Sequence, residues 1–184
     1  ALDFPGESRG LLKPADELWG SERVTVAYGQ GLSSTPIQMA AAINVIANDG
    51  VYVAPKLVRA TVGPDGTMTD IAPSATHRVV SEAAAQQTAV MMEAVVCSPE
   101  GTANAAQVEG LPIAGKTGTA FKAAENGTYF DENGDRIYYA SFAGFFPADD
   151  PQVTVLVAMD EPPAASDQRF GGRALPLRGG PAQP

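Results

Sequence analysis

The strongest constraint on the fold is a succession of three extended segments in the C-terminal half of the chain. They read "PIAGKTGTAFK", "IYYASFAGFFP" and "VTVLVAMD". Short segments rich in β-branched and aromatic residues, bounded by turn formers, are typical of β-strands. Only "ADDPQ" joins the second segment to the third, a connection short enough for antiparallel neighbours but not for parallel ones. The sequence therefore predicts an antiparallel meander, and we expect its last, almost continuously apolar strand to be covered on both faces by helices.

Two segments upstream of the meander are predicted to be helices. Either Ser34 or Thr35 is the candidate N-cap before a proline that suits the first helical turn, and Gly50 ends that segment. Ser81 is a candidate N-cap for a second helix over residues 82–97. Between them, the turn formers at residues 64–66 predict a small hairpin. Helices packed against an antiparallel sheet make the expected class α+β.

The chain of 184 residues is long enough for one domain with a hydrophobic core. We expect this domain to span residues 1–162. Residues 163–184 are rich in Pro, Gly and Arg without periodicity, which indicates a mobile tail. The first residues, "ALDFPGES", resemble the middle of a loop more than a chain start, so we expect the domain to be part of a longer protein.

Composition excludes several classes of function. The net charge of -9 argues against nucleic-acid binding, because phosphate contacts need clustered Lys and Arg. The chain has one cysteine, Cys97, which excludes an internal disulfide and a thiolate metal site. It has one histidine, His77, which excludes a multi-histidine metal site. We expect Cys97 to be a packed thiol and His77 a surface imidazole. We expect no metal and no cofactor. The longest apolar run, residues 39–47, is far below the ~18 residues of a bilayer span.

The segment "GLPIAGKTGTAFK" admits two interpretations. Residues 110–117 fit G-x-x-x-x-G-K-T, the phosphate loop of nucleotide hydrolases, and Lys116, Thr117 and Gly118 also form the K-T-G triplet of penicillin-binding proteins. A phosphate loop needs a buried strand before it and a helix directly after it. The polar "AAQVE" before it and the Gly118-Thr119 pair after it do not favour that context. The nucleotide hydrolase stays open as an alternative, as does a non-catalytic domain that binds a peptide or partner protein.

Five segments, in order, carry a resemblance to a known family. They are "LDFPGES", "VAYGQGLSSTPIQMAAAINVIANDG", "GKTGTA", "YYASFAGFFP" and "VLVAMDEP". Together they resemble the C-terminal half of the transpeptidase domain of class B penicillin-binding proteins, over about residues 1–172. The resemblance implies an α+β fold with an antiparallel sheet packed between helices, here incomplete. It also implies a parent enzyme that cross-links peptidoglycan stem peptides ending in D-Ala-D-Ala and is acylated by β-lactams.

The resemblance further assigns roles to four consecutive residues. Lys116 would place a positive charge beside the nucleophile and the terminal carboxylate of the substrate. Thr117 and Thr119 would offer hydroxyl groups to that carboxylate, and the N–H of Thr119 would be one of two oxyanion-hole donors. Gly118 would let the substrate backbone lie close against the strand. The parent protein would be anchored in the cell membrane, with this domain on the extracytoplasmic side among other division or cell-wall synthesis proteins.

Two departures from the family pattern are visible. No serine of this chain is followed three residues later by Lys or two residues later by Asn, so the nucleophile motif S-x-x-K and the S-x-N motif are both absent. We therefore predict that the chain alone is inactive. In place of the apolar terminal helix that the resemblance implies, this chain ends in "RALPLRGGPAQP". One face of the sheet is thus expected to lack its cover.

Overall fold

The computed structural model describes residues 6–122, 124, 127–132 and 134–162. The predicted tail at residues 163–184 lies outside the described residues. The elements in chain order are η1 (Ala15–Glu17), α1 (Glu22–Thr25), η2 (Val26–Tyr28), α2 (Pro36–Ala47), β1 (Val51–Val53), β2 (Ala60–Val62), β3 (Met68–Asp70), β4 (Thr76–Arg78), α3 (Glu82–Cys97), η3 (Asn104–Ala106), β5 (Ala114–Phe121), β6 (Tyr138–Phe146) and β7 (Val153–Asp160). Helices and antiparallel sheets together confirm the α+β class.

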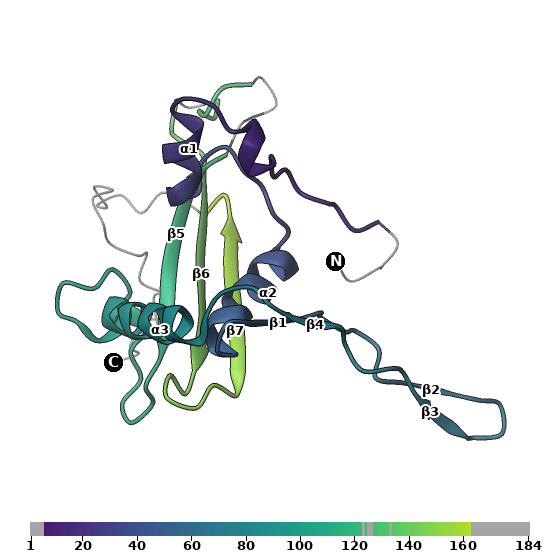
Figure 1. The fold of residues 1–184 in the computed structure, drawn as a ribbon. Helices are drawn as coiled ribbons and strands as arrows, with labels where there is room; N and C mark the ends of the chain where they lie inside the picture. The colour runs from purple at the N-terminus through teal and green to yellow at the C-terminus, as the bar shows by residue number, and fades with distance from the viewer. Residues whose placement is uncertain (1–5, 123, 125–126, 133, 163–184) are drawn as a thin grey trace, which may run out of the picture.

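The central sheet is the predicted meander, with the strand order β5-β6-β7 (Figure 1). Both pairings are antiparallel, and the register places Gly118 opposite Ser141 and Ser141 opposite Ala158. Because successive side chains of a strand point to opposite faces, this register also assigns every side chain of the sheet to a face. Within the described residues, β5 pairs only with β6 and is therefore an edge strand.

Helix α2 begins at the predicted N-cap. The Thr35 hydroxyl accepts a hydrogen bond from the Gln38 backbone N–H at 3.3 Å, and the Gln38 side chain accepts one from the Thr35 N–H at 2.9 Å. This reciprocal capping box satisfies two N–H groups that the helix cannot bond internally. The helix ends before Asp49 and Gly50, both of which have positive φ. The amide of Gln38 also donates to the carbonyl of Ser8 at 3.2 Å, which ties the N-terminal segment to the helix.

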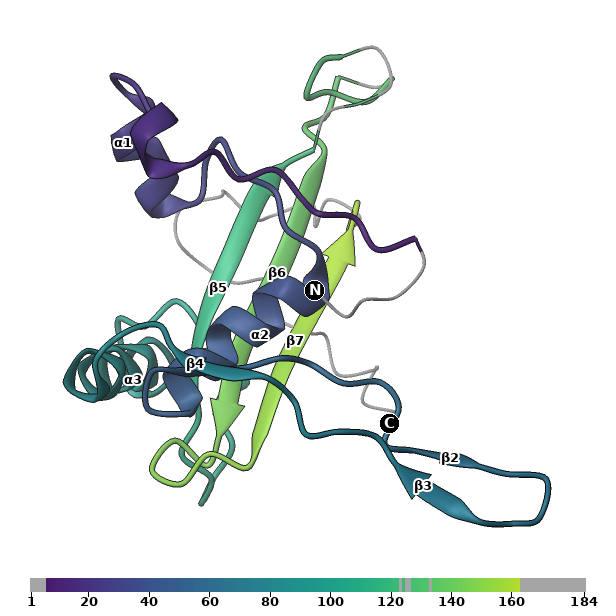
Figure 2. The same ribbon diagram turned by 45° about the vertical axis from the view of Figure 1, so that its right-hand side comes forward.

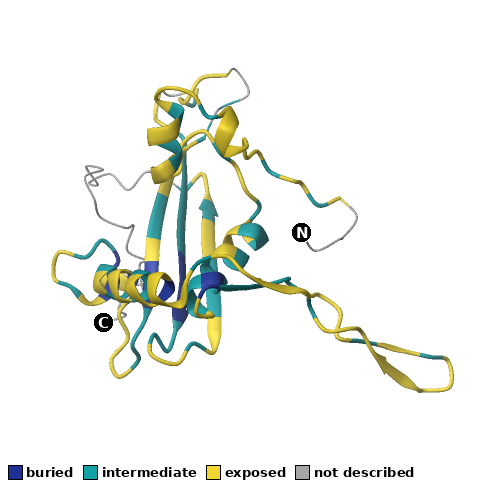
Figure 3. Cartoon of the chain, viewed as in Figure 1, coloured by how far each residue is buried: buried dark blue, intermediate teal, exposed yellow. Residues whose placement is uncertain are grey.

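The core lies where α2 and α3 meet one face of the sheet (Figures 2 and 3). Met92 of α3 packs against Ala114 of β5 and Phe145 of β6, and the last two are fully buried. Apolar residues of α2 border this cluster, and the hydroxyl of Thr154 bonds Asn44 of that helix at 2.8 Å. Burial of this seam fixes both helices against the same end of the sheet.

The opposite face of the sheet is open within the described residues, so the expectation that β7 is covered on both faces is wrong. Val153 and Val157 are 46% and 47% exposed. The register places Val157 beside Phe142, on the face away from Phe145. Among the described residues, this apolar strand thus has helical cover on one side only.

A two-stranded ribbon extends from the body of the molecule (Figure 1). It consists of the pair β1-β4 followed by the pair β2-β3, and the latter closes through the predicted turn at residues 64–66. Within that turn Asp65 accepts hydrogen bonds from the Thr67 hydroxyl at 2.7 Å and the Thr67 N–H at 3.0 Å. These two bonds lower the pKa of the Asp65 carboxyl, because both favour its charged form.

The N-terminal segment contains more helix than its composition indicates. Short helical turns occupy η1, α1 and η2 before Gly29, which has a φ of 91°. Lys13 forms an ion pair with Glu22 at 2.6 Å, and that hydrogen bond holds the pKa of Glu22 below its ordinary value. Elements of three or four residues are too short to display a helical period, which explains why the sequence pattern indicated a loop. No helix among the described residues is long and apolar enough to span a bilayer.

Candidate active site

The K-T-G triplet lies on the edge strand β5, and its backbone is oriented by the pairing with β6. The Lys122 N–H donates to the Ile137 carbonyl at 3.0 Å. In an antiparallel pair, residues that bond the neighbouring strand alternate with residues whose N–H and C=O groups point away from it. Counting back from Lys122, the backbone groups of Thr117 and Thr119 therefore point toward the open edge. A second peptide strand has hydrogen-bonding groups available there.

Lys116 is exposed, and its side chain bends around this edge. Its Nζ donates to the outward-pointing Thr117 carbonyl at 2.8 Å and lies 3.4 Å from the Thr117 hydroxyl. Among the described residues, no carboxylate lies within ion-pair distance of Lys116. The ammonium group is thus held at the edge by neutral oxygens, where it can take up a bound anion.

The hydroxyl of Thr117 is positioned by Thr102, a residue that the sequence analysis did not identify. The two hydroxyl oxygens are 3.1 Å apart. Thr102 is presented by a loop that closes the end of α3: the Ala103 N–H donates to the Val95 carbonyl at 3.0 Å, and the Asn104 amide donates to the carbonyls of Val96 and Ser98. The same loop contains the short helical turn η3. Thr102 carries no motif of its own, so only the fold reveals its contact.

Two glycines of this strand are explained by packing within the sheet. A Cβ on Gly115 would lie 2.2 Å from the Phe142 ring, which rests across the strand at that point. A Cβ on Gly118 would lie 2.6 Å from the Ser141 hydroxyl. A hydroxyl can rotate away whereas an aromatic ring in a sheet cannot easily do so, so the steric demand is firm at Gly115 and softer at Gly118. Sheet packing alone therefore does not account fully for glycine in the triplet.

The same geometry rules out the phosphate-loop interpretation of residues 110–117. Ala114–Phe121 is a β-strand, and the chain continues from it toward β6 without entering a helix. A phosphate cradle requires N–H groups that converge at a helix N-terminus directly after the Lys-Thr pair. The nucleotide hydrolase alternative is therefore wrong.

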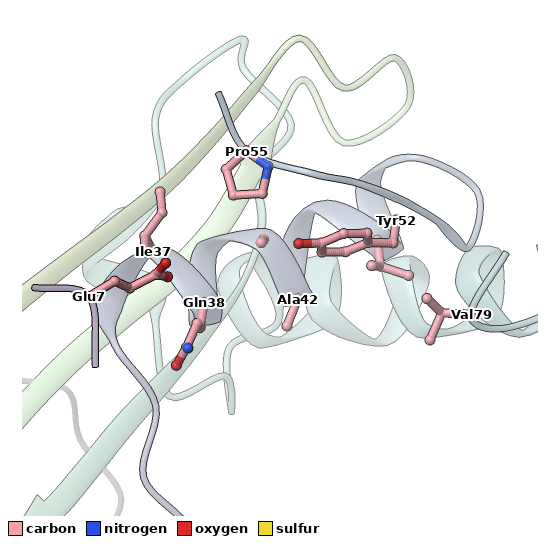
Figure 4. A pocket seen from close by; sticks show the side chains of 9 residues that line it. Glu7, Ile37, Gln38, Ala42, Tyr52, Pro55 and Val79 are labelled. Carbon is pink, nitrogen blue, oxygen red and sulfur yellow. The ribbon is translucent and has the colours of Figure 1, made fainter. Parts of the chain in front are cut away.

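The hollow that borders α2 lies apart from the K-T-G strand (Figure 4). Its volume is about 260 Å³, and its mostly apolar lining includes Ile37, Val45, Tyr52 and Val79. The amide of Gln38, which also lines it, is already engaged in the capping box and with Ser8. This hollow is a seam between α2, the ribbon and the N-terminal segment. The polar side chains of the K-T-G triplet lie at the sheet edge instead.

A second hollow of about 360 Å³ borders the C-terminal end of α3 and includes Cys97. This thiol is exposed, so the expectation that it is packed is wrong. Its neighbour Val96 takes the buried position of the last helical turn, and adjacent residues on a helix point about 100° apart. No cluster of three or more metal-ligating side chains occurs among the described residues.

The comparison with known proteins identifies the family. The family model described as "Penicillin binding protein transpeptidase domain" matches residues 1–174 of this chain. The chain belongs to this family. PbpB of Mycolicibacterium smegmatis is 42% identical over 182 residues, a match that covers 96% of this chain and 28% of the relative. Stage V sporulation protein D of Bacillus subtilis is 39% identical and is matched over 97% of this chain and 27% of its own length.

Solved structures of other penicillin-binding proteins share the fold. The apo form of penicillin-binding protein 3 from Mycobacterium tuberculosis is 41% identical, with a TM-score of 0.78 over 94% of this chain and 39% of that one. The aztreonam complex of the same protein gives a TM-score of 0.77 at 40% identity, over 88% of this chain and 36% of that one. The resemblance to class B penicillin-binding proteins and the incomplete transpeptidase fold are thereby confirmed. The chain spans little more than a quarter of the length of the curated relatives that it matches.

Proposed function

We propose that this chain is part of a longer serine-type D,D-transpeptidase that binds penicillin and cross-links the stem peptides of peptidoglycan. The observation that carries the proposal is the edge strand β5, on which Lys116 and Thr117 lie side by side and the Thr119 backbone faces the open edge. In this proposal residues 1–162 form the C-terminal portion of the transpeptidase domain and residues 163–184 form a tail. Membrane anchoring, with the domain on the extracytoplasmic side, is part of the same proposal.

The substrate peptide lies antiparallel along the open edge of β5. Lys116 and the hydroxyl of Thr117 receive its terminal carboxylate, with Thr102 orienting that hydroxyl through the 3.1 Å contact. The N–H of Thr119 points at the carbonyl oxygen of the penultimate D-Ala and stabilises the negative charge that develops there. Gly118 has no side chain, so the substrate backbone can lie close to the strand between these two contacts.

The reaction itself needs a serine from outside this chain. Its hydroxyl attacks the penultimate D-Ala carbonyl, the C–N bond to the terminal D-Ala breaks, and the departing amine takes up the proton. An amine of a second stem peptide then displaces the serine. A β-lactam that acylates the same serine blocks this sequence, and the mycobacterial relative has been solved with aztreonam and with ampicillin. We carry β-lactam binding over to the longer protein on that ground.

Labelling with fluorescent penicillin tests whether the nucleophilic serine lies outside this chain, in the rest of the longer protein. The longer protein, with the residues that precede Ala1, is expected to show a covalent band after denaturing electrophoresis. The 184-residue chain is expected to show none, because it has no S-x-x-K serine. A covalent band on the 184-residue chain would contradict the missing nucleophile. An unlabelled longer protein would contradict the transpeptidase and favour a non-catalytic domain that binds a peptide or partner.

Thr119→Pro tests the oxyanion role directly, because proline removes the backbone N–H. Acylation of the longer protein by penicillin is expected to slow by about 10²–10³-fold, the usual cost of losing one oxyanion-hole donor. The Thr119 N–H faces away from β6, so the strand pairing is expected to survive. Ala120→Pro is the contrasting variant, since it deletes an N–H that faces β6 and should lower the melting temperature. Acylation of Thr119→Pro within threefold of the unsubstituted rate would overturn the assignment.

A further inference from the structure

A cluster of three aromatic rings around one arginine lies where β5 ends and the connection to β6 returns. We call Phe121, Tyr129, Phe130 and Arg136 the Arg136 cluster. The guanidinium carbon of Arg136 is 4.7 Å from the ring centroid of Phe121 and 5.3 Å from that of Phe130. The ring centroids of Phe121 and Tyr129 are 6.2 Å apart. The three rings are 41–51% exposed, so the cluster is a surface feature and not part of the core.

The backbone holds this cluster in place. Phe130 and Arg136 form an antiparallel bridge, and the Ile137 N–H donates to the Tyr129 carbonyl at 3.0 Å. The turn beyond them is closed by the Asp131 N–H, which donates to the Asp135 carbonyl at 2.8 Å, and by the Asp131 carboxylate, which accepts the Asp135 N–H at 2.8 Å. Arg136 is therefore presented by a paired hairpin, with its guanidinium in contact with two rings.

Among the residues that the structure describes, Arg136 forms no ion pair with an acidic side chain. No carboxylate of the described residues lies within ion-pair distance of its guanidinium, whereas Lys13 pairs with Glu22, and Lys122 pairs with Asp160 and Glu161. Contact with ring faces orients the group but leaves its N–H donors at the ring periphery available. In a chain with a net charge of -9, an exposed arginine in this state is suited to a carboxylate from another molecule.

The proposed function, on which this inference rests, determines which part of a peptide passes the cluster. With the terminal carboxylate at Lys116 and Thr117 and the reacting carbonyl at Thr119, the rest of the peptide runs toward its N-terminus past Phe121. Residues 119 and 121 are separated by about 7 Å along the strand, at ~3.4 Å per residue. Antiparallel pairing therefore sets the peptide residue two positions before the penultimate D-Ala beside Phe121.

We propose that the Arg136 cluster is a second anion-binding subsite, which recognises a side-chain carboxylate of the substrate upstream of its D-Ala-D-Ala end. Arg136 is the residue that determines this specificity. Phe121 and Phe130 are positioning residues that hold the guanidinium at the end of β5, beside Phe121. The two cationic points, Lys116 at one end and Arg136 at the other, select peptides that carry both a terminal and an upstream carboxylate.

The test compares two peptides that differ only in charge, Ac-Glu-Ala-D-Ala-D-Ala and Ac-Gln-Ala-D-Ala-D-Ala. The readout is the ratio of kcat/KM for D-Ala release from the two peptides by the longer protein. Arg136→Gln is expected to lower the Glu-to-Gln ratio by about tenfold or more, the effect of losing a charge-assisted hydrogen bond. Arg136→Lys, which keeps the charge without the planar fork, is expected to give an intermediate ratio. Arg59→Gln, which removes an equal charge from the ribbon, should leave the ratio unchanged.

The outcomes separate this subsite from the proposed function. A longer protein that neither releases D-Ala nor takes up fluorescent penicillin overturns the transpeptidase and the subsite with it. A protein that is labelled normally but whose Glu-to-Gln ratio is the same in Arg136→Gln overturns the subsite alone. Equal losses for both peptides in Arg136→Gln and Arg136→Lys also overturn it, because they show a structural role without selectivity.

Discussion

Replacing Lys116 by alanine in the longer protein is expected to slow its acylation by penicillin about 10²–10⁴-fold, the usual range for a positioned group that assists proton transfer. The ammonium lies at the open edge of β5, 2.8 Å from the Thr117 carbonyl. In the proposed function this charge faces both the nucleophile and the carboxylate of the ligand, so its removal weakens docking and chemistry together. Stopped-flow kinetics with a chromogenic or fluorescent penicillin measure the second-order acylation rate.

Lys122→Ala is the matched control, at the residue that directly follows β5. Lys122 lies 2.8 Å from Asp160 and 2.7 Å from Glu161, so its charge is held by the end of β7. The hydrogen bond with Asp160, and to a lesser degree the one with Glu161, raises the pKa of Lys122. The variant therefore removes a positive charge from the surface. Its acylation rate is expected to stay within about threefold of the unsubstituted protein, the scale of a weak exposed ion pair. An equal loss of acylation rate in the two variants would mean that Lys116 acts only through the net charge of the protein and not through its position.

Phe145→Ala is expected to destabilise the fold of this chain by about 3–5 kcal/mol, the usual cost of truncating a buried Phe. Phe145 is fully buried and packs with Met92 and Ala114 where both long helices meet the sheet. Alanine leaves a cavity at this junction, because the backbones of three strands and two helices cannot all close around it. Urea unfolding followed by circular dichroism gives the change in the free energy of unfolding.

Phe130→Ala is the control for that measurement. Phe130 is 41% exposed and contacts Arg136 at the surface, so its truncation should cost about 0.5–1 kcal/mol. A loss in Phe145→Ala no larger than in Phe130→Ala would show that the seam between helices and sheet is not the stabilising core of the molecule. The same comparison in the longer protein measures how much additional packing Phe145 gains there.

The elements of this fold could be predicted from local signals. Thr35 and Ser81 cap the two long helices as expected, because an N-cap hydroxyl bonds an N–H only two or three residues away. The meander follows from tight connections between apolar segments. The short helical turns before Gly29 were missed, since so few residues show no period. The exposure of Val157 was also missed, because an apolar strand reads the same whether one face or both are covered.

For the candidate site, the sequence indicated which residues carry the motif but not which other residues contact them. The run Lys116 to Thr119 stood out as a motif within a wider resemblance. Thr102 and Arg136 did not, because each depends on partners 15 residues away, at Thr117 and Phe121 respectively. No single position at either place has an unusual residue type. Thr102 is one of several polar residues in the loop after α3, and the sequence gives no reason to prefer it over Ser98 or Glu100.

By itself, the sequence determined the order of the two long helices and the three strands of the meander, the triplet on β5 and the absence of a serine motif. Only the tertiary structure decided that the Thr119 N–H points to the open edge and that the exposed face of the described sheet is the one that carries Val157. The physical reason is that a strand sequence shows which side chains share a face, because successive side chains point to opposite faces of the sheet. Which side is inward, and which backbone groups are used, is set by pairing and packing with segments far along the chain.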